Sequence, residues 1–285
     1  MTGNLFLIDR IDCEDEAPER TPLEHLVPNF IDRHRQGMAM PTLLIRCAGK
    51  RDDGVTSSPS SVKAISQLRE HGSPTGLHVH TKRDEHRSKI PEHYFDPDQM
   101  RIQIEEGIGR FQTTFGESPR VFGMGDLACS CEAVAALLGE YGIQLDLGDI
   151  ISPKHLWRDG EQFYDYTTAN WRTDLPIYKH HMWWIPLGTD GVEGDQGSGT
   201  LGLNIGQDEQ IFDQIFSRYR KLGESNPDKL VMISSVVHPP ETLRRWDAWQ
   251  QMHQIAALHG FRSITSLEAI DLLEATCQGE AAARG

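Results

Sequence analysis

The chain has 285 residues, of which 38% are hydrophobic and 25% charged, the balance of a globular domain with a substantial core. Its formal net charge of −14 argues against nucleic acids and anionic membrane surfaces as partners. The sequence has no apolar run of about eighteen residues, and residues 1–9 do not form a secretion signal. The five cysteines show no disulfide spacing. We therefore expect a cytoplasmic protein.

Short apolar runs alternate with helical periodicities in the first half of the chain. The apolar runs predict strands at Leu5–Ile8, Thr42–Ile45, Gly76–Thr81, Arg120–Gly123 and Ile143–Leu147. The segments between them predict helices at Pro22–Gln36, Ser61–His71, Asp98–Phe115 and Cys131–Tyr141. Alternation of this kind is typical of a parallel sheet whose strands are connected by helices.

The second half begins with a different kind of segment. His155–Leu203 has four tryptophans, clustered glycines and little helical periodicity, and we interpret it as loops and irregular strands that line part of a pocket. Alternation then returns, with helices at Asp208–Leu222, Pro240–Leu258 and Ser266–Ala275 and strands at Leu230–Val237 and Phe261–Thr265. We predict an α/β fold with a single domain over residues 1–285. It is a distorted (β/α) barrel of seven or eight parallel strands with a loop-rich insertion around 151–205.

Three polar clusters follow predicted strands: Asp12-Cys13-Glu14, His78-Val79-His80 and His238-Pro239. A barrel gathers the ends of its strands around one pocket. Carboxylates and imidazoles are ligands for zinc and related divalent metals, which lower the pKa of water. A further carboxylate can accept a proton, and a histidine can protonate a leaving nitrogen. The clusters together predict metal-dependent amide hydrolysis.

Each cluster also has a structural interpretation. The acidic run from Asp12 to Glu16 is typical of a solvated loop or a helix cap. His78 is a candidate for the only histidine ligand, with His80 packing or binding a neighbouring carboxylate. His238 is equally a candidate for a capping or buried hydrogen-bonding residue. Asp9 remains an alternative to Asp12, because one sequence does not fix where the strand ends.

The order of these motifs resembles the polysaccharide deacetylase (nodulation-deacetylase homology, carbohydrate esterase) family. The segments that carry the resemblance run in order over nearly the whole chain and are Ile11-Asp12-Cys13-Glu14-Asp15, Pro41-Thr42-Leu43-Leu44-Ile45, Thr75-Gly76-Leu77-His78-Val79-His80-Thr81, Tyr141-Gly142-Ile143-Gln144-Leu145-Asp146 and Val236-Val237-His238-Pro239-Pro240-Glu241. The resemblance implies a distorted (β/α) barrel that removes acyl groups from amino sugars.

The resemblance also implies roles for individual residues. Asp12 corresponds to the general base and His238 to the general acid. Glu14 and His78 correspond to metal ligands, and His80 is the expected third ligand. The implied cofactor is one divalent metal ion, with zinc favoured over cobalt, nickel, iron and manganese.

The chain departs from the family pattern at three places, the first of which is Glu14, where many members have Asp. The family's second histidine normally stands four residues after the first, where this chain has Lys82, so His80, or with less support His86, has to substitute. The arginine that normally orients the base is missing from Phe122-Gly123-Met124-Gly125-Asp126. These departures affect the metal geometry and the substrate more than the fold.

The resulting hypothesis is a metal-dependent hydrolase of a C–N amide bond, an N-deacetylase of an amino sugar or a related small intracellular molecule. Its partner is a small-molecule or oligosaccharide substrate, and the oligomeric state is left open. One alternative is an amidohydrolase or phosphoesterase of another metal-dependent barrel superfamily, suggested by the H-x-H pattern. Another is a metal-free binding protein without catalysis, suggested by the missing arginine and by Lys82.

Overall fold

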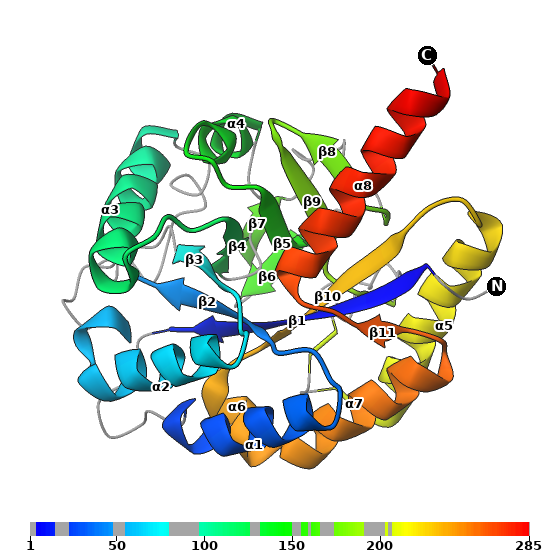
Figure 1. Cartoon of the computed structure of the whole chain (residues 1–285), viewed down its shortest axis with the longest axis horizontal. Coiled ribbons are helices and arrows are strands. Elements are labelled where there is room, and N and C mark those ends of the chain that lie inside the picture. The colour runs from blue at the N-terminus through cyan, green and yellow to red at the C-terminus, as the bar shows by residue number, and fades with distance from the viewer. Residues whose placement is uncertain are drawn as a thin grey trace.

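A curled sheet of mainly parallel strands lies at the centre of the molecule, with helices around it (Figure 1). The computed structural model describes residues 4–14, 23–47, 55–79, 97–125, 132–149, 155–158, 161–165, 174–190, 203–204 and 207–284. Neighbouring strands follow the order β10-β1-β2-β3-β4-β5-β9-β8. The predicted distorted (β/α) barrel, formed as a single α/β domain, is confirmed.

Most strands and helices lie where the sequence predicts them. The strands are β1 (Leu5–Cys13), β2 (Thr42–Arg46), β3 (Thr75–Val79), β4 (Val121–Met124), β5 (Leu145–Asp149), β6 (His155–Arg158), β7 (Glu161–Asp165), β8 (Ile177–Lys179), β9 (Met182–Pro186), β10 (Val231–Val237) and β11 (Arg262–Ser263). The helices are α1 (Leu23–Arg35), η2 (Val55–Ser57), α2 (Pro59–Glu70), α3 (Pro97–Phe115), α4 (Glu132–Glu140), α5 (Glu209–Ser225), α6 (Pro239–Arg244), α7 (Trp246–Leu258) and α8 (Ser266–Arg284).

The curled sheet closes on itself between the end of β9 and the middle of β10. Leu187 and Ser234 form a parallel bridge, and the Gly188 amide donates a 2.9 Å hydrogen bond to the Ser234 carbonyl. On its other side, β10 pairs in parallel with β1 from Leu5↔Val231 to Ile11↔Val237. Parallel strands end at the same rim of a barrel, so residues that follow β1, β3 and β10 are brought together there.

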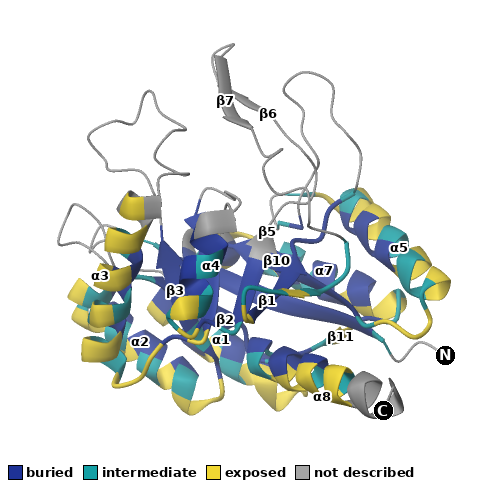
Figure 2. Cartoon of the chain, turned by 90° about the horizontal axis from the view of Figure 1, so that it is seen from above, coloured by how far each residue is buried: buried dark blue, intermediate teal, exposed yellow. Residues whose placement is uncertain are grey.

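The two faces of β1 pack against different groups of residues. Phe6 and Ile8 face the barrel interior, in a cluster that includes Ile270 and Leu273 of α8. Helix α8 therefore closes the end of the barrel where the strands begin. Leu5, Leu7, Ile11 and Cys13 belong instead to the larger cluster beneath the surrounding helices. Figure 2 shows the buried strands between helices whose outer faces are exposed.

Three elements differ from the sequence prediction. Strand β1 continues to Cys13 and is buried throughout, because its polar side chains find partners inside the protein. Met182–Pro186 is a regular, fully buried barrel strand, not an irregular wall segment. The helix predicted over Pro240–Leu258 is two helices, which break at Arg245, the N-cap of α7. Much of the predicted insertion at 151–205 lies outside the described residues, so that boundary remains a prediction.

Among the described helices, we find none with the length and hydropathy needed to cross a membrane.

Candidate active site

A row of three polar residues follows the apolar start of β1 on the inner face of the barrel. Arg10, Asp12 and Glu14 continue the two-residue period that begins with Phe6 and Ile8. Arg10 is fully buried and Asp12 is 3% exposed, whereas the Glu14 side chain is 28% exposed. The row therefore runs from the closed interior of the barrel towards its open rim.

Arg10 holds both oxygens of Asp12 with one edge of its guanidinium group. Its Nε donates to Asp12 Oδ1 at 2.7 Å and its Nη2 donates to Asp12 Oδ2 at 2.7 Å. Nη2 also donates to the carbonyl oxygen of Met124 at 3.0 Å, and Nη1 donates to the carbonyl oxygen of Leu147. A bidentate pair with two further carbonyl partners fixes the plane of the Asp12 carboxylate.

The pKa of Asp12 results from two opposed effects. Burial alone would raise it, because the charged carboxylate loses its hydration. The positive charge of Arg10, then that of His78, and the Arg10 hydrogen bonds outweigh burial and hold the pKa below its ordinary value. Asp12 is therefore a carboxylate at neutral pH. How readily it accepts a proton depends on Arg10 and His78.

His78 comes from β3 and points to Glu14 across the rim. Its Nδ1 lies 2.9 Å from the carbonyl oxygen of Gly123 on β4, and its Nε2 lies 3.2 Å from Glu14 Oε1. A carbonyl oxygen only accepts hydrogen bonds, so Nδ1 carries a proton. In a neutral ring, Nε2 then presents its lone pair to the Glu14 carboxylate. Two acceptors face each other, an arrangement that is stable only with a proton or a cation between them.

His238 follows the end of β10 and completes the group. Its Nε2 lies 3.5 Å from Glu14 Oε1, and its side chain is 36% exposed. Ligand atoms of Asp12, Glu14 and His238 all lie within 4.8 Å of one another. Because Glu14 and His238 are partly exposed, a small molecule in solvent can reach them.

The donor set fits a divalent transition metal. Glu14 contributes a carboxylate oxygen and His78 an imidazole nitrogen whose other ring nitrogen is held by a carbonyl. This second hydrogen bond fixes the tautomer that a histidine ligand needs. Oxygen and imidazole ligands suit zinc and its neighbours better than calcium or magnesium.

Some sequence-predicted residues lie outside the described residues, and one lies away from this group. His80, Lys82 and Asp126 lie outside the described residues, so the prediction that His80 is a ligand stays a prediction. Asp9 points away from the site, where it contacts Ser235 and His253.

The tryptophans of the predicted loop-rich segment are only partly described. Trp183 and Trp184 are 9% and 3% exposed and pack in the core. Trp171 and the side chain of Trp157 lie outside the description.

Sequence reasoning missed Arg10. It stands between two acidic residues in Asp9-Arg10-Ile11-Asp12, and no role was predicted for it from the sequence. The signal was its spacing, because residues two apart on a strand share a face, and opposite charges on one face attract each other.

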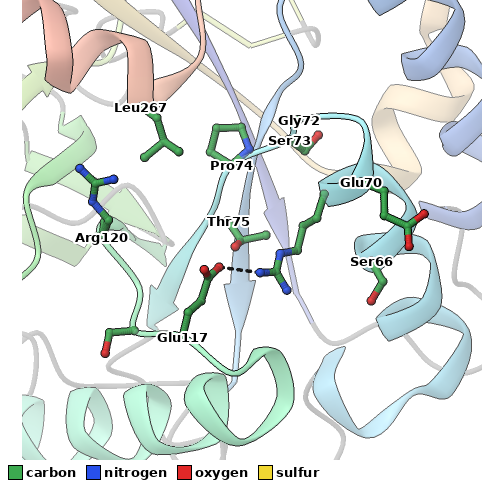
Figure 3. A pocket seen from close by; sticks show the side chains of 11 residues that line it. Ser66, Glu70, Gly72, Ser73, Pro74, Thr75, Glu117, Arg120 and Leu267 are labelled. Carbon is green, nitrogen blue, oxygen red and sulfur yellow. Dashed lines mark hydrogen bonds and ion pairs between the residues drawn. The ribbon is translucent and has the colours of Figure 1, made fainter.

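A separate pocket lies at the opposite end of the strands (Figure 3). Its lining includes Thr75 at the start of β3, Arg120 before β4 and Leu267 of α8, and its volume is about 570 Å³. Its two arginines are engaged, Arg69 by Glu117 at 2.7 Å and Arg120 by Gln144. The residues that line this pocket include none of Asp12, Glu14, His78 and His238.

No protein-family model and no curated protein sequence matches the chain. Solved structures do match it in fold. A candidate polysaccharide deacetylase from Mycobacterium smegmatis aligns with a TM-score of 0.59 at 13% identity, over 96% of this chain and 91% of that one. An allantoinase, Puue, aligns with a TM-score of 0.57 at 14% identity, over 95% and 90%. A CE4-family pseudoenzyme from Bacillus anthracis aligns with a TM-score of 0.50 at 9% identity, over 95% and 66%. The chain therefore shares its fold with deacetylase-like proteins, some of which are pseudoenzymes.

Proposed function

We propose that the protein is a metal-dependent hydrolase of a C–N amide bond, with an N-acylated amino sugar or a related small amide as substrate. The single observation that carries the proposal is the arrangement around Glu14. Its Oε1 faces the Nε2 atoms of His78 and His238 at 3.2 and 3.5 Å, at the open rim of the barrel. A bound divalent ion would act as a Lewis acid and make hydroxide available near neutral pH.

Glu14 and His78 are the proposed ligands of the ion, and His80 is the predicted third ligand. The hydrogen bond from His78 Nδ1 to the Gly123 carbonyl turns Nε2 towards Glu14. A histidine that is oriented in this way needs little reorganisation to bind metal. The chemistry of the donors supports one transition metal ion, with zinc as the first choice.

Asp12 and His238 are the proposed proton carriers. Asp12 is buried, ionised and held in one plane by Arg10, so it can accept a proton from the attacking water. His238 lies at the more exposed side of the group and can give a proton to the leaving nitrogen. The two residues come from different strands and face one ligand group, as an acid and a base on either side of a reacting amide require.

The substrate is proposed only as a chemical class. The fold is shared with a candidate polysaccharide deacetylase and with an allantoinase, so the common element is hydrolysis of an amide bond rather than one particular sugar. An amino sugar with an N-acyl group is the first substrate to test, and small cyclic or acyclic amides are the second.

The test is metal analysis of the purified protein together with His78→Ala. We expect about one equivalent of zinc or a similar metal in the parent and a loss of that metal in the variant. Glu14→Gln, at a partly exposed position, tests the same site with less risk to folding. N-acylated sugars are then screened with the metal-loaded parent.

His71→Ala is the matched control, because His71 is exposed at the end of α2, away from the rim. It should keep the full metal content. If the folded parent binds no zinc, cobalt or nickel, the hydrolase proposal fails and a metal-free binding protein is favoured. Two equivalents of metal with phosphatase activity would favour another barrel superfamily.

A further inference from the structure

Asp12 lies between two groups that compete for its carboxylate. On one side is the Arg10 guanidinium, which donates one hydrogen bond to each carboxylate oxygen at 2.7 Å. On the other side are Glu14 and His238, whose ligand atoms lie within 4.8 Å of an Asp12 oxygen and of each other. By distance alone, Asp12 could serve as a metal ligand as readily as Glu14.

Arg10 is held so that its guanidinium group stays on Asp12. It is fully buried, and its remaining N–H groups donate to the carbonyl oxygens of Met124 and Leu147, near the ends of β4 and β5. Gly123 leaves room for it: a Cβ at that position would lie 3.1 Å from Arg10 Cζ and 2.3 Å from Leu44 Cδ1. Asp12, the two carbonyl groups and Gly123 therefore surround the guanidinium group inside the barrel.

A carboxylate held in this way is a poor additional ligand for a cation. The two N–H donors already compensate its charge, and an ion bound to the same oxygens would lie close to a fixed positive group. Glu14 is 28% exposed and faces two imidazoles, with its Oε1 at 3.2 Å from His78 Nε2 and 3.5 Å from His238 Nε2. Asp12 and Glu14 are only two residues apart, yet an arginine surrounds the first carboxylate and two imidazoles face the second.

We infer that Arg10 is a positioning residue that keeps Asp12 out of the ligand set of the ion and so leaves it free to accept a proton. The inference rests on the proposed metal site, which it deepens. It assigns the two carboxylates to different roles through one buried side chain from β1. It also has an unusual consequence, because loss of Arg10 should strengthen metal binding while it weakens catalysis.

The experiment is a titration with Zn²⁺ alone, by calorimetry, on Arg10→Met, Asp12→Asn and the double variant. Arg10→Met should bind Zn²⁺ about tenfold more tightly than the parent, since Asp12 is released as a ligand and a nearby positive charge is lost. In the Asp12→Asn background, the same change should alter the affinity by about twofold or less. This comparison separates release of the carboxylate from simple loss of charge.

Co²⁺ provides a second readout that does not depend on activity. An added carboxylate ligand changes the coordination number, and the visible absorption of bound Co²⁺ should change in Arg10→Met but not in the double variant. Arg33→Met is the matched control, since Arg33 is another largely buried arginine that acts on Asp9 on the opposite face of β1. It should leave both the affinity and the spectrum as in the parent.

Arg10→Lys serves if Arg10→Met does not fold. A lysine keeps the charge but cannot hold both oxygens at once, so a smaller change in the same direction is expected. A folded Arg10 variant with unchanged or weaker Zn²⁺ binding would overturn the inference and leave the proposed function intact. Equal tightening with and without the Asp12 carboxylate would also overturn it. A parent that binds no ion would instead overturn the proposed function, and the inference with it.

Discussion

The two faces of β1 each carry a buried aspartate with cationic partners, yet only the inner face can act on a ligand. On the inner face, Asp12 pairs with Arg10 and continues to Glu14 at the rim. On the outer face, Asp9 accepts a 2.8 Å hydrogen bond from Ser235 Oγ, and its Oδ2 lies 2.9 Å from His253 Nε2. The ingredients are almost the same: a carboxylate, an imidazole and a guanidinium.

Access to solvent separates the two groups. His253 is 5% exposed and Asp9 2% exposed, and the ring of Trp249 packs against His253 with 4.4 Å between centroids. Arg33 covers the same tryptophan, with Cζ 4.3 Å from the ring centroid. Helices α1 and α7 thus seal the outer group, whereas the inner group ends in partly exposed side chains. Residue types alone do not define a site, because the same set serves packing wherever a substrate cannot reach it.

The largest expected effect is on catalysis and concerns His238. His238→Asn should lower turnover by about 10²–10⁴-fold, since a general acid contributes on that scale. Its partly exposed position predicts little loss of stability. Turnover of the amide found in the substrate screen and thermal unfolding are the measurements. A variant with parental turnover would remove His238 from the mechanism.

The next largest effect concerns Asp9 and its partners on the outer face of β1. There we expect a loss of stability without a change in metal binding. Asp9→Asn leaves His253 and Arg33 without their buried counter-charge, so we expect a loss of about 3–5 kcal/mol in the free energy of unfolding. Zn²⁺ affinity should stay as in the parent. Urea unfolding and calorimetry measure the two quantities. A parental stability together with altered metal binding would show that the two faces are not separate.

Asp9→Asn should also change how the free energy of unfolding depends on pH in the acidic range. Burial would raise the pKa of Asp9, but the charge and hydrogen bond of His253, the Ser235 hydrogen bond and the charge of Arg33 outweigh it and lower the pKa below 3.8. A lowered folded-state pKa means that its stabilisation is complete above about pH 4 and disappears as the pH falls through the lower value. Unfolding free energy should therefore fall less steeply below pH about 4 in Asp9→Asn than in the parent. Parallel curves would contradict this assignment.

The smallest effect concerns the space around Arg10. Gly123→Ala places a Cβ against Leu44 and the guanidinium, and overpacking of this kind costs about 1–3 kcal/mol. Gly109→Ala is the control, because nothing lies within 4 Å of a Cβ at that position in α3. It should stabilise the protein by about 0.5–1 kcal/mol through helix propensity. Chemical denaturation of both variants measures the difference, and equal effects would show that Gly123 is not packed as described.

The order of strands and helices could be predicted from the sequence because each strand is a short apolar run. The predicted strand ends at Ile8, because the apolar run ends there and acidic residues follow, whereas β1 continues to Cys13. A single sequence does not reveal that Ser235 and His253 lie beside them. It also missed β9, whose Met-Trp-Trp-Ile-Pro run is as apolar as the other strands but lies in a region of glycines and loops.

The site was predictable in composition but not in geometry. Asp12, Glu14, His78 and His238 could be identified by their position near the ends of predicted strands, and their side chains lie together at the rim of the barrel. The roles of the carboxylates depend on Arg10, and the orientation of His78 depends on the Gly123 carbonyl. The Arg10 contact could have been inferred from its two-residue spacing, whereas the Gly123 contact joins residues 45 positions apart, which no local sequence pattern connects.

The seam between β1 and β10 also bears on how the protein is made. Ser235 and Asp9, which bond across this seam, are 226 residues apart in the chain. Glu14 and His238 belong to the same two sides, so the candidate site is divided between segments that a ribosome produces far apart in time. Contacts of such long range form late in folding. A nascent chain from which His238 has not yet emerged carries the carboxylates without this histidine, so the candidate site stays incomplete until β10 has been made.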